Sequence, residues 1–495
     1  MESYPSCVDV ISPNTDILNM TSESLKDRVD RLKDAGVFAK YWVKNWGNVA
    51  RIIKTRGPKE LKSRAERFEW IKRARNPNRM LARFLAGRTG LYREATGYLM
   101  NQTGRTIGSY FDNYFTMPGK TILHEDLVPA EIFKGMGLNT WMAELMGILS
   151  PVISKELGEF FIDASENAGI PSDTCSLPKV TMGMVLTNQM PPPVAIVASN
   201  MPCDSGMSSY AVMQEKFNVP IFRLDTPYNF YNERAVDYFV GELKRLIAWL
   251  EIHTPGKMDW DRMREIICER NRAVEYEMEL WDLLCAKPSP MAADPVFFSH
   301  LIYICTVPGD PAGTQTFKRI VELARNNMKM GRGALKNERY RVALWNPPTL
   351  SYPDMWNWAE QAYGTAMIMD MLTYNRQPLI DPSTPETILR GLCRVIMEGP
   401  MARHTRGPSD NFFSDLFHLY ERFSLDMIWM AGHVGCKNTM ALNGMFREKC
   451  RERDIPLLTI NYDLADSRVV SPKEIRAQVE GFMETVMKAE KNPGF

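Results

Sequence analysis

The sequence predicts an α/β protein with two parallel-sheet domains that follow a helical N-terminal region. Two segments, 194–225 and 426–463, each read as a strand, a loop with one cysteine, a helix and a second strand ending in Asp. Such β-loop-α-β units are the building blocks of parallel sheets. Residues before these units are polar with helical spacing. We expect a helical region over 1–117, a first α/β domain with long helices over 118–305, and a second α/β domain over 306–495.

Helix signals dominate the N-terminal region. Thr21 or Ser22 is a suitable helix N-cap. An apolar stripe follows at Leu25, Val29 and Leu32, and its i, i+4, i+7 spacing is that of one helical face. The stripe predicts a helix that packs through this face.

A basic segment over residues 51–84 comes next. It holds twelve Lys or Arg and three acids, a net charge of +9, whereas the whole chain carries +1, so the remainder must carry −8. Pro58 and Asn76-Pro77 predict that the segment is broken into short helices. Four large apolar residues are candidate buried anchors of these helices: Phe68, Trp70, Phe84 and Leu85.

The first α/β unit begins with an apolar run from Val194 to Ala198, directly after three prolines. A turn with Cys203 follows, and then a helical stretch over 208–217. The next strand is predicted over 220–225.

The second unit repeats this order near the C-terminus. Its strands are predicted over 426–431 and 456–463, and its helix over 438–453, after a loop that ends in Cys436. A further strand is predicted over 341–345. We interpret the likeness as two similar domains and not as a sequence repeat.

Two long helices are predicted between the units. The first spans 232–253 and carries Val236, Phe239, Leu243, Ile247 and Leu250 on one face. The second opens at the N-cap Asp259 and runs to about Ala286, with an apolar stripe at Met263, Ile267, Val274, Met278 and Trp281. Two prolines, at 288 and 290, end it.

The composition excludes a disordered chain, a collagen and a small protein held together by disulfides. Hydrophobic residues make up 45% and charged residues 24% of the chain, which is ordinary for a globular protein. No apolar run approaches the roughly 18 residues of a membrane-spanning helix. The start shows no signal peptide, so we expect a cytoplasmic protein with reduced thiols, no membrane and no nucleic-acid partner.

Two of the nine cysteines lie where ligands bind in α/β proteins, and a third lies at a predicted helix start. Cys203 and Cys436 follow predicted strands, and the crevice at the carboxyl ends of parallel strands is the usual ligand site. Cys175 precedes Ser176 and Pro178, which resemble a helix cap and a first-turn proline. A helix N-terminus favours the thiolate. The three thiols either share a metal site between the domains or are small buried apolar residues.

Several motifs, in order along residues 118–495, resemble the 2-hydroxyacyl-CoA dehydratase and benzoyl-CoA reductase superfamily. They are VPAEIFKGMG at 128–137, DTCSLPK at 173–179, ASNMPCDS at 198–205, KPSPM at 287–291, GHVGC at 432–436 and DLADSR at 463–468.

The resemblance implies two flavodoxin-like domains, with one [4Fe–4S] cluster held between them by Cys175, Cys203 and Cys436. It also implies a paralogous second subunit in a heterodimer, and a separate ATP-dependent iron–sulfur activator protein. The chain lacks Walker and G-x-G-x-x-G phosphate loops and is therefore not itself the ATPase.

The implied reaction belongs to anaerobic metabolism and is the radical dehydration of an (R)-2-hydroxyacyl-CoA. One added electron makes a ketyl radical anion, which expels the hydroxyl group and acidifies the β-position. A cluster held by only three cysteines has one iron without a cysteine ligand, and that iron has room for the thioester oxygen. The alternatives are a subunit of an aromatic-CoA reductase, a non-catalytic electron-relay subunit, and an RNA- or anion-binding protein that uses residues 51–84.

Candidate proton carriers lie where the sequence departs from the family. Hydroxyl residues that precede the family's Pro-x-Glu motif are replaced by a stretch with His124 and Glu125. His124 could be a proton donor or base near pH 7, and Glu125 or Glu131 could ligate or orient the cluster; alternatively, Glu125 and Asp126 cap a helix that starts at Pro129. His433 is a further acid, base or neighbour of the cluster.

Two further segments have expected roles in substrate or partner binding. Residues 404–409 have a loop composition, and this loop either touches the acyl group or the cluster or simply joins the domains. The basic segment either contacts the partner subunit or the phosphates of CoA, or is a solvated face.

Overall fold

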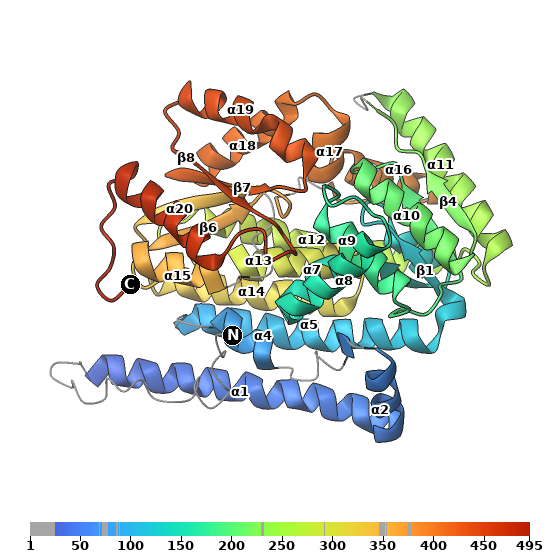
Figure 1. Cartoon of the computed structure of the whole chain (residues 1–495), viewed down its shortest axis with the longest axis horizontal. Coiled ribbons are helices and arrows are strands. Elements are labelled where there is room, and N and C mark those ends of the chain that lie inside the picture. Colours follow the sequence, from blue (N-terminus) through green and yellow to red (C-terminus); the bar gives the residue numbers. More distant parts are fainter. Residues whose placement is uncertain are drawn as a thin grey trace.

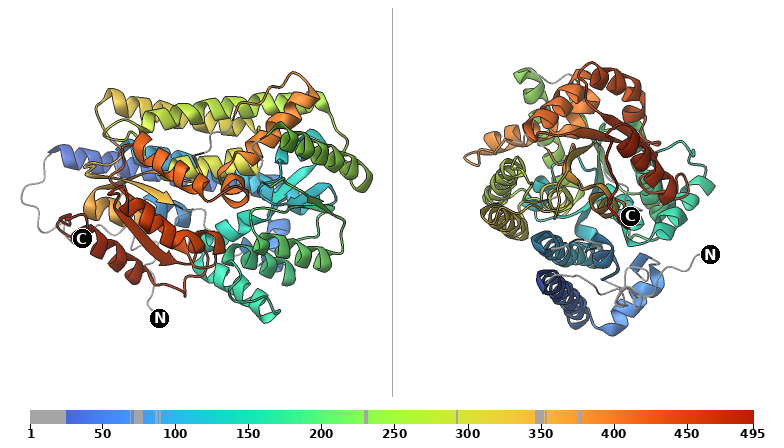
Figure 2. Two further views of the ribbon diagram at one scale, coloured as in Figure 1. Left: turned by 90° about the horizontal axis from the view of Figure 1, so that it is seen from above. Right: turned by 90° about the vertical axis from the view of Figure 1, so that its left-hand side faces the viewer.

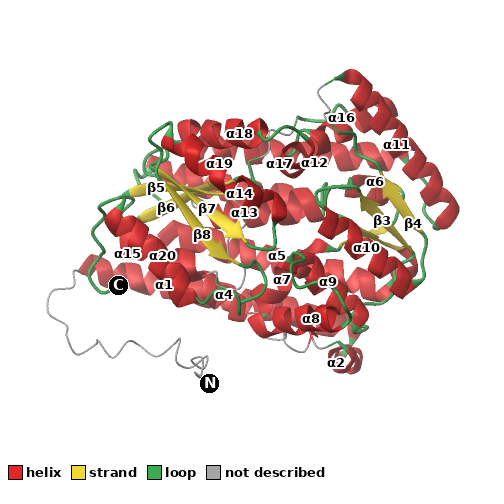
Figure 3. Cartoon of the chain, turned by 45° about the horizontal axis from the view of Figure 1, so that its top comes forward, coloured by secondary structure: helices red, strands yellow, loops and turns green. Residues whose placement is uncertain are grey.

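The computed structural model describes residues 25–68, 70–71, 78–85, 88, 90–228, 232–291, 293–345, 352, 354–374 and 378–495. Two four-stranded parallel sheets lie side by side, each surrounded by helices, above an N-terminal helical layer (Figures 1 and 3). The predicted α/β class with a helical N-terminal region is therefore confirmed. The predicted caps Thr21 and Ser22 lie outside the described residues, as do Cys7 and Asn76-Pro77.

The N-terminal layer consists of four helices: α1 (Leu25–Arg56), α2 (Pro58–Arg67), α4 (Asn78–Leu85) and α5 (Gly90–Thr116). α1 and α5 pack along one another, and α5 lies between α1 and the rest of the molecule (Figures 1 and 2). The four predicted anchors of the basic segment are all buried. Arg56 and Arg64 both contact Asp112 of α5, at 2.5 and 3.0 Å, so part of the local positive charge is used inside the layer.

The first sheet has the order β2-β1-β3-β4, with all neighbours parallel. Its strands are β1 (Thr121–His124), β2 (Asn139–Met142), β3 (Ala195–Ser199) and β4 (Ile221–Leu224). The order 2-1-3-4 is that of flavodoxin-like sheets, whose ligands bind at the carboxyl ends of the strands. β3 and β4 confirm two predicted strands, whereas β1 and β2 were not individually predicted.

The second sheet repeats this topology with the order β6-β5-β7-β8, again all parallel. Its strands are β5 (Tyr340–Trp345), β6 (Thr365–Asp370), β7 (Met427–His433) and β8 (Leu457–Tyr462). Three of the four match predicted strands. The two sheets thus share one strand order, as the repeated sequence pattern indicated.

Helices cover both faces of the first sheet. Those on the face that also contacts α5 are α7 (Glu144–Ile153), α8 (Lys155–Asn167), α9 (Ser176–Leu186) and α10 (Asp204–Phe217). Those on the other face are α6 (Ala130–Gly135), α11 (Glu233–His253), α12 (Trp260–Leu284) and α16 (Pro385–Met397). α16 comes from the second half of the sequence but packs on α11 and α12.

The second sheet is covered in the same way. One face carries α15 (Asp354–Tyr363) and α20 (Pro472–Thr485). The other carries α13 (Ala293–His300), α14 (Pro311–Lys329), α18 (Asp410–Arg422) and α19 (Lys437–Arg451). The short elements are a 3₁₀ turn (Pro118–Lys120), a π-helical turn (Leu301–Thr306) and α17 (Pro400–Arg406).

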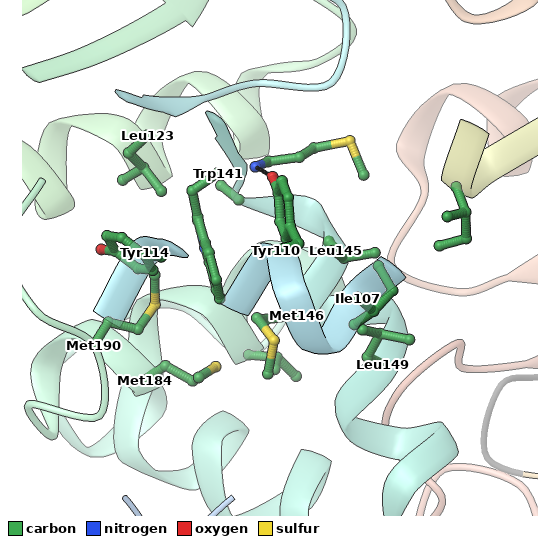
Figure 4. Close-up of a cluster of buried hydrophobic side chains, with 14 of the residues drawn as sticks. Ile107, Tyr110, Tyr114, Leu123, Trp141, Leu145, Met146, Leu149, Met184 and Met190 are labelled. Carbon is green, nitrogen blue, oxygen red and sulfur yellow. Dashed lines mark hydrogen bonds between the residues drawn. The ribbon is translucent and has the colours of Figure 1, made fainter. Parts of the chain in front are cut away.

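An aromatic cluster joins the N-terminal layer to the first sheet (Figure 4). Trp141 of β2 is fully buried, and its ring lies 5.5 Å from that of Tyr110 and 4.3 Å from that of Tyr114, both on α5. The Tyr110 hydroxyl accepts a hydrogen bond from the Met142 N–H at 2.6 Å. Large buried aromatic rings dominate core energetics, so this cluster fixes α5 on the sheet.

Several predictions about helices can be compared directly with the structure. Asn232 and Asp259 cap α11 and α12 through their side chains, which confirms both predicted starts. Met278 was predicted on the apolar face of α12 but is 43% exposed. Val29 and Leu32 are exposed as well, so the predicted packing face of α1 is wrong: α1 packs on α5 through its opposite side. No helix in the described part of the chain is long and apolar enough to cross a membrane.

Candidate functional site

The three predicted cysteines come together, and each one is the N-cap of a helix. Cys203 follows β3 and caps α10, Cys436 follows β7 and caps α19, and Cys175 caps α9. All three line one cavity of about 260 Å³. We call it the thiol cavity. Sequence reasoning had placed the cap of α9 one residue later, at Ser176, which is instead the first residue of the helix.

Local geometry explains these positions. Cys203 has an extended backbone, and its Sγ accepts a hydrogen bond from the Gly206 N–H at 3.4 Å, as an N-cap side chain does. The Cys436 Sγ lies 3.1 Å from the Thr439 hydroxyl. A Cβ on Gly435 would come within 3.0 Å of the Cys175 Cα, so glycine lets the two cysteine loops approach.

The electrostatics of the thiol cavity suit a metal cluster. Burial raises the pKa of the Cys175 and Cys203 thiols, and the neighbouring thiols raise it further, so an added positive charge is needed to hold thiolates here. Three helix N-termini and an iron–sulfur cluster would supply that charge. Among the described residues no group of three or more His, Cys, Asp or Glu side chains is arranged so that it could hold a metal ion. Three separate thiols around one cavity have the donor set that a cluster would need, since each thiolate would bind a different iron.

His433 contacts one of the three cysteines, Cys175, directly. Its Nε2 lies 3.2 Å from the Cys175 Sγ, and its Nδ1 accepts the Leu464 N–H at 3.2 Å. Since Nδ1 is an acceptor, the proton lies on Nε2 and points at the sulfur. Burial lowers the pKa of His433, while Asp463 at 3.5 Å opposes the shift. The geometry makes His433 a hydrogen-bond donor to Cys175.

A second, mostly apolar cavity of about 290 Å³ adjoins the thiol cavity and shares its three cysteines. We call it the apolar cavity. Its wall includes Met142, Leu177, Phe297, Leu301, Ile304 and Met371. It also reaches the acids Asp126, Glu131 and Glu144. An apolar space with a few convergent polar groups is the usual form of a small-molecule site.

His124 and Glu125 do not line either cavity. Both are completely buried, and burial lowers the pKa of His124 to about 4. The His124 Nδ1 lies 2.9 Å from the Glu125 carbonyl oxygen, and Glu125 accepts the Leu127 N–H at 3.0 Å. α6 has Pro129 as its N-cap without a side-chain hydrogen bond, so the alternative that Glu125 and Asp126 cap it is wrong.

Sequence reasoning missed Glu144, the first residue of α7, just beyond the end of β2. Its Oε1 accepts the Tyr210 hydroxyl at 2.5 Å, whereas its buried Oε2 has no hydrogen-bond partner within the described residues. Burial, together with Asp126, raises the pKa of Glu144 to about 8. Glu144 is therefore a carboxyl group that can change protonation near neutral pH. An acidic residue just after a predicted strand end is a candidate site residue, so predicting β2 would have identified Glu144. The four-residue strand was not predicted from the sequence.

Charged groups also form part of the wall of the apolar cavity. Arg270 contacts Glu131 at 3.2 Å, and both are buried. Burial lowers the pKa of Arg270, while Glu131 opposes the shift. His300 contacts Glu277 at 2.7 Å. These pairs place charge deep in an otherwise apolar space, where buried charges persist only with partners.

His404 lies in a helix and not in the predicted loop. It belongs to α17, and its Nε2 lies 2.9 Å from the Asp415 carboxylate. His404 and Thr405 both line the apolar cavity, and Thr405 lines the thiol cavity too. The prediction of a loop over 404–409 is therefore wrong for its first three residues, although the segment does lie at the site.

Comparison with known proteins gives consistent matches. Residues 127–486 match the family model described as 2-hydroxyglutaryl-CoA dehydratase, D-component. The (R)-2-hydroxyisocaproyl-CoA dehydratase alpha subunit of Clostridioides difficile is 25% identical over 238 residues, which are 45% of this chain and 57% of that protein. The lactoyl-CoA dehydratase subunit alpha of Anaerotignum propionicum is 22% identical over 354 residues, 65% of this chain and 81% of that protein.

A further relative has a different acyl group in its name. The (R)-phenyllactyl-CoA dehydratase alpha subunit of Clostridium sporogenes is 21% identical over 225 residues, 44% of this chain and 54% of that protein. The chain thus spans a little more than half the length of two of these relatives and about four-fifths of the third.

Proposed function

The chain belongs to the 2-hydroxyglutaryl-CoA dehydratase D-component family, and on that premise we propose that it is a subunit of a lyase that eliminates water from an (R)-2-hydroxyacyl-CoA. One observation supports this proposal most. Three helix-capping cysteines from two like-folded halves surround one cavity, and that cavity adjoins an apolar space with a titratable carboxyl group. This arrangement has the parts for one-electron chemistry on an apolar thioester.

Cys175, Cys203 and Cys436 would hold one [4Fe–4S] cluster. When bound, such a cluster supplies single electrons and an iron with room for a thioester oxygen. The chain's own residues do the remaining work. His433 donates a hydrogen bond to the Cys175 sulfur, a contact that in metal sites orients a ligand and tunes the metal. The apolar wall excludes water from the reacting thioester.

Glu144 is the proton carrier in this proposal. With a pKa of about 8 it is protonated at neutral pH and donates its proton to the departing hydroxyl, which leaves as water. The carboxylate so formed then takes the proton from the β-carbon, the product gives up the added electron as it becomes the enoyl-CoA, and the carboxyl group returns to its starting state. Tyr210 donates a hydrogen bond to one carboxyl oxygen, and the backbone of Glu144 and Asp126 also hydrogen-bonds the carboxyl group. His124 and Glu125, the residues expected from the sequence, line neither cavity, so we assign the role to Glu144.

Two partner proteins belong to the proposal. The relatives are named as alpha subunits, so we propose a second subunit, which would be a paralogue of this chain. A separate ATP-hydrolysing iron–sulfur protein would deliver the electron, because the described chain has no phosphate-binding glycine loop.

The test is a reconstituted reaction under nitrogen. This protein, its paralogous subunit, the activator, ATP and a strong reductant should convert a 2-hydroxyacyl-CoA into the enoyl-CoA. The Glu144→Gln variant should lose most of this activity but keep its iron. Reduction of an aromatic acyl-CoA ring in place of dehydration, with ATP consumed in fixed ratio, would contradict the proposal and favour a reductase. Full activity without this chain would also contradict it.

A further inference from the structure

The outward face of α1 carries a regular apolar stripe. Its positions are separated alternately by three and four residues from the first to the last: Val29, Leu32, Gly36, Ala39, Val43, Trp46, Ala50 and Ile53. All eight are exposed. We call them the α1 seam. Apolar residues at alternating three- and four-residue steps are the heptad pattern of a helix that pairs with another helix.

The seam is not the face through which α1 packs on its own chain. Tyr41, Asn45 and Asn48 lie on the inward side, where Tyr41 bonds Glu94 at 2.6 Å and Asn45 accepts from Asn101 at 2.8 Å. A Cβ built on Gly36 would meet no atom within 4 Å. The seam thus lies on the side of α1 away from α5, although the Trp46 indole nitrogen lies 3.1 Å from the side-chain amide of Asn78 on α4.

The exposure of the seam is exceptional for this molecule. Of the 21 large apolar side chains that are exposed within the described residues, six lie on α1, including Val43 at 63% and Leu32 at 74%. Both exposed tryptophans of the described chain, Trp42 and Trp46, are among the six. Clustered exposed apolar side chains mark interaction sites, and tryptophan is enriched at the centres of protein interfaces.

The side-chain sizes along the seam indicate the partner. If a second copy of α1 runs antiparallel about a point at Tyr41, four layers form: Val29 with Ile53, Leu32 with Ala50, Gly36 with Trp46, and Ala39 with Val43. In three of these layers a small residue faces a larger one, and the glycine faces the tryptophan. A parallel pair would instead stack Trp46 on its copy and leave a void between two glycines, and close packing disfavours both.

Charges beside the seam are partly neutralised within the chain. Lys40, which would meet its own copy near the two-fold axis, contacts Glu94 at 2.6 Å. Arg56 contacts Asp112 at 2.5 Å. These internal ion pairs reduce the repulsion between two basic helices that approach one another.

We propose that the chain forms a two-fold symmetric dimer with a second copy of itself through an antiparallel pair of α1 helices. A two-fold interface is self-complementary, as the paired layers are. From Val29 to Ile53 the contact runs for about 36 Å of helix. The seam lies outside the family-matched residues 127–486 and in the outermost layer of the molecule (Figures 1 and 2). Dimerisation does not rest on the proposed reaction.

The first test is the oligomeric state of the purified chain, without other subunits, by sedimentation velocity at micromolar concentrations. The wild type should sediment as a dimer. Val43→Glu should raise the dimer dissociation constant at least about tenfold, because a carboxylate would lose its water in the seam. Lys44→Glu introduces the same residue one position away from the seam and should leave the dimer intact. A wild type that stays monomeric, or a dimer unaffected by Val43→Glu, would overturn the proposal. Circular dichroism confirms that each variant is folded.

The second test is orientation. Ala39→Cys and Val43→Cys variants are prepared separately and treated under nitrogen with a short bismaleimide, with the wild type as the control for native thiols. An antiparallel dimer cross-links efficiently only when the two variants are mixed, because position 39 faces position 43 of the other copy. Cross-linking of each variant with itself, and no gain on mixing, would indicate a parallel pair and overturn the antiparallel arrangement.

Discussion

The two α/β halves have the same strand order but contribute differently to the site. In both, the third strand ends at a loop whose cysteine caps the next helix: Cys203 after β3 and Cys436 after β7. The carboxyl ends of parallel strands are where such folds bind ligands. Shared topology therefore accounts for two of the three thiols, while Cys175, on α9 of the first half, is an addition.

The acids near the second strands show the larger difference. Glu144, just after β2, lines the apolar cavity with one carboxyl oxygen that has no hydrogen-bond partner among the described residues. Asp370, at the end of β6, accepts the Leu372 N–H at 2.9 Å, the Thr373 N–H at 3.1 Å and the Thr373 hydroxyl. Both halves thus have a carboxyl group close to the end of their second strand, β2 or β6. In the first half the carboxyl group lines the apolar cavity, and in the second it closes a turn.

The largest effect on activity is expected from replacing the three cysteines, because all three are proposed ligands of one cluster. Replacing Cys175, Cys203 or Cys436 with Ser should each abolish the iron–sulfur absorbance and essentially all dehydratase activity, because the cluster loses a thiolate. Cys393→Ser is the matched control, since this thiol is buried in α16 among apolar side chains. Iron analysis after anaerobic purification measures the difference. If a Cys436→Ser protein kept its cluster while Cys203→Ser lost it, the two halves would not contribute equivalently.

Glu144→Gln should lower kcat by about 10²- to 10⁴-fold, the range for loss of a general acid–base group, with little change in KM. Iron content should not change, because Glu144 is not among the residues of the thiol cavity. Steady-state kinetics of the reconstituted enzyme measure this. A kcat within about twofold of wild type would remove Glu144 from the proton transfer.

The pH dependence of the wild type gives an independent check on Glu144. The donor is the protonated carboxyl group, whose pKa lies at about 8, so kcat should fall as the pH rises through about 8. Tyr210→Phe removes a hydrogen bond that lowers this pKa, so the falling limb should move to higher pH. A profile unchanged by Tyr210→Phe would indicate that another group is titrating.

A smaller effect is expected for His433, which acts on the site through Cys175. His433→Ala removes the hydrogen bond to the sulfur and should reduce activity about 10- to 100-fold, as loss of partners around metal ligands does. The cluster should remain but with a shifted reduction potential, because the sulfur keeps more of its charge. A potentiometric titration followed by electron paramagnetic resonance measures the shift. An unchanged potential together with full activity would reduce His433 to a packing role.

The smallest effect on activity is expected for Asp370→Asn, the second-half counterpart of Glu144. The variant keeps one oxygen for both N–H groups but loses the acceptor of the Thr373 hydroxyl, which should cost about 1 kcal/mol of unfolding free energy. Activity should stay within about twofold of wild type. Chemical denaturation and the same kinetic assay measure both. A large loss of kcat would show that Asp370 and Glu144 have similar roles in the reaction. It would contradict the difference proposed between the two halves.

Much of the fold follows from local sequence signals. Strands bounded by proline, such as β3 and β8, and helices with side-chain caps, such as Asp259, were predictable because the signal lies within the element itself. The cysteines were predictable because they follow such strands. β1 and β2 have four residues each, which is too short for a period-two pattern to be distinguished from helix.

What could not be predicted depends on long-range packing. Whether Val29 and Leu32 face inward or outward depends on which side of α1 meets α5, and both sides carry apolar residues. The role of Glu144 depends on Tyr210 of α10 and Asp126 after β1, which the fold brings together from distant positions. His124 is fully buried and is not among the residues that line either cavity, and this depends on packing around the strand that its sequence does not show.

The most direct test of the account is Mössbauer spectroscopy of the wild-type chain after anaerobic reconstitution with ⁵⁷Fe and sulfide. Three thiols capping three helices predict one cluster with about four iron atoms per chain, in which one iron site differs from the other three because it lacks a thiolate. Four equivalent sites, or a cluster that persists when Cys175, Cys203 and Cys436 are all replaced with Ser, would contradict the account.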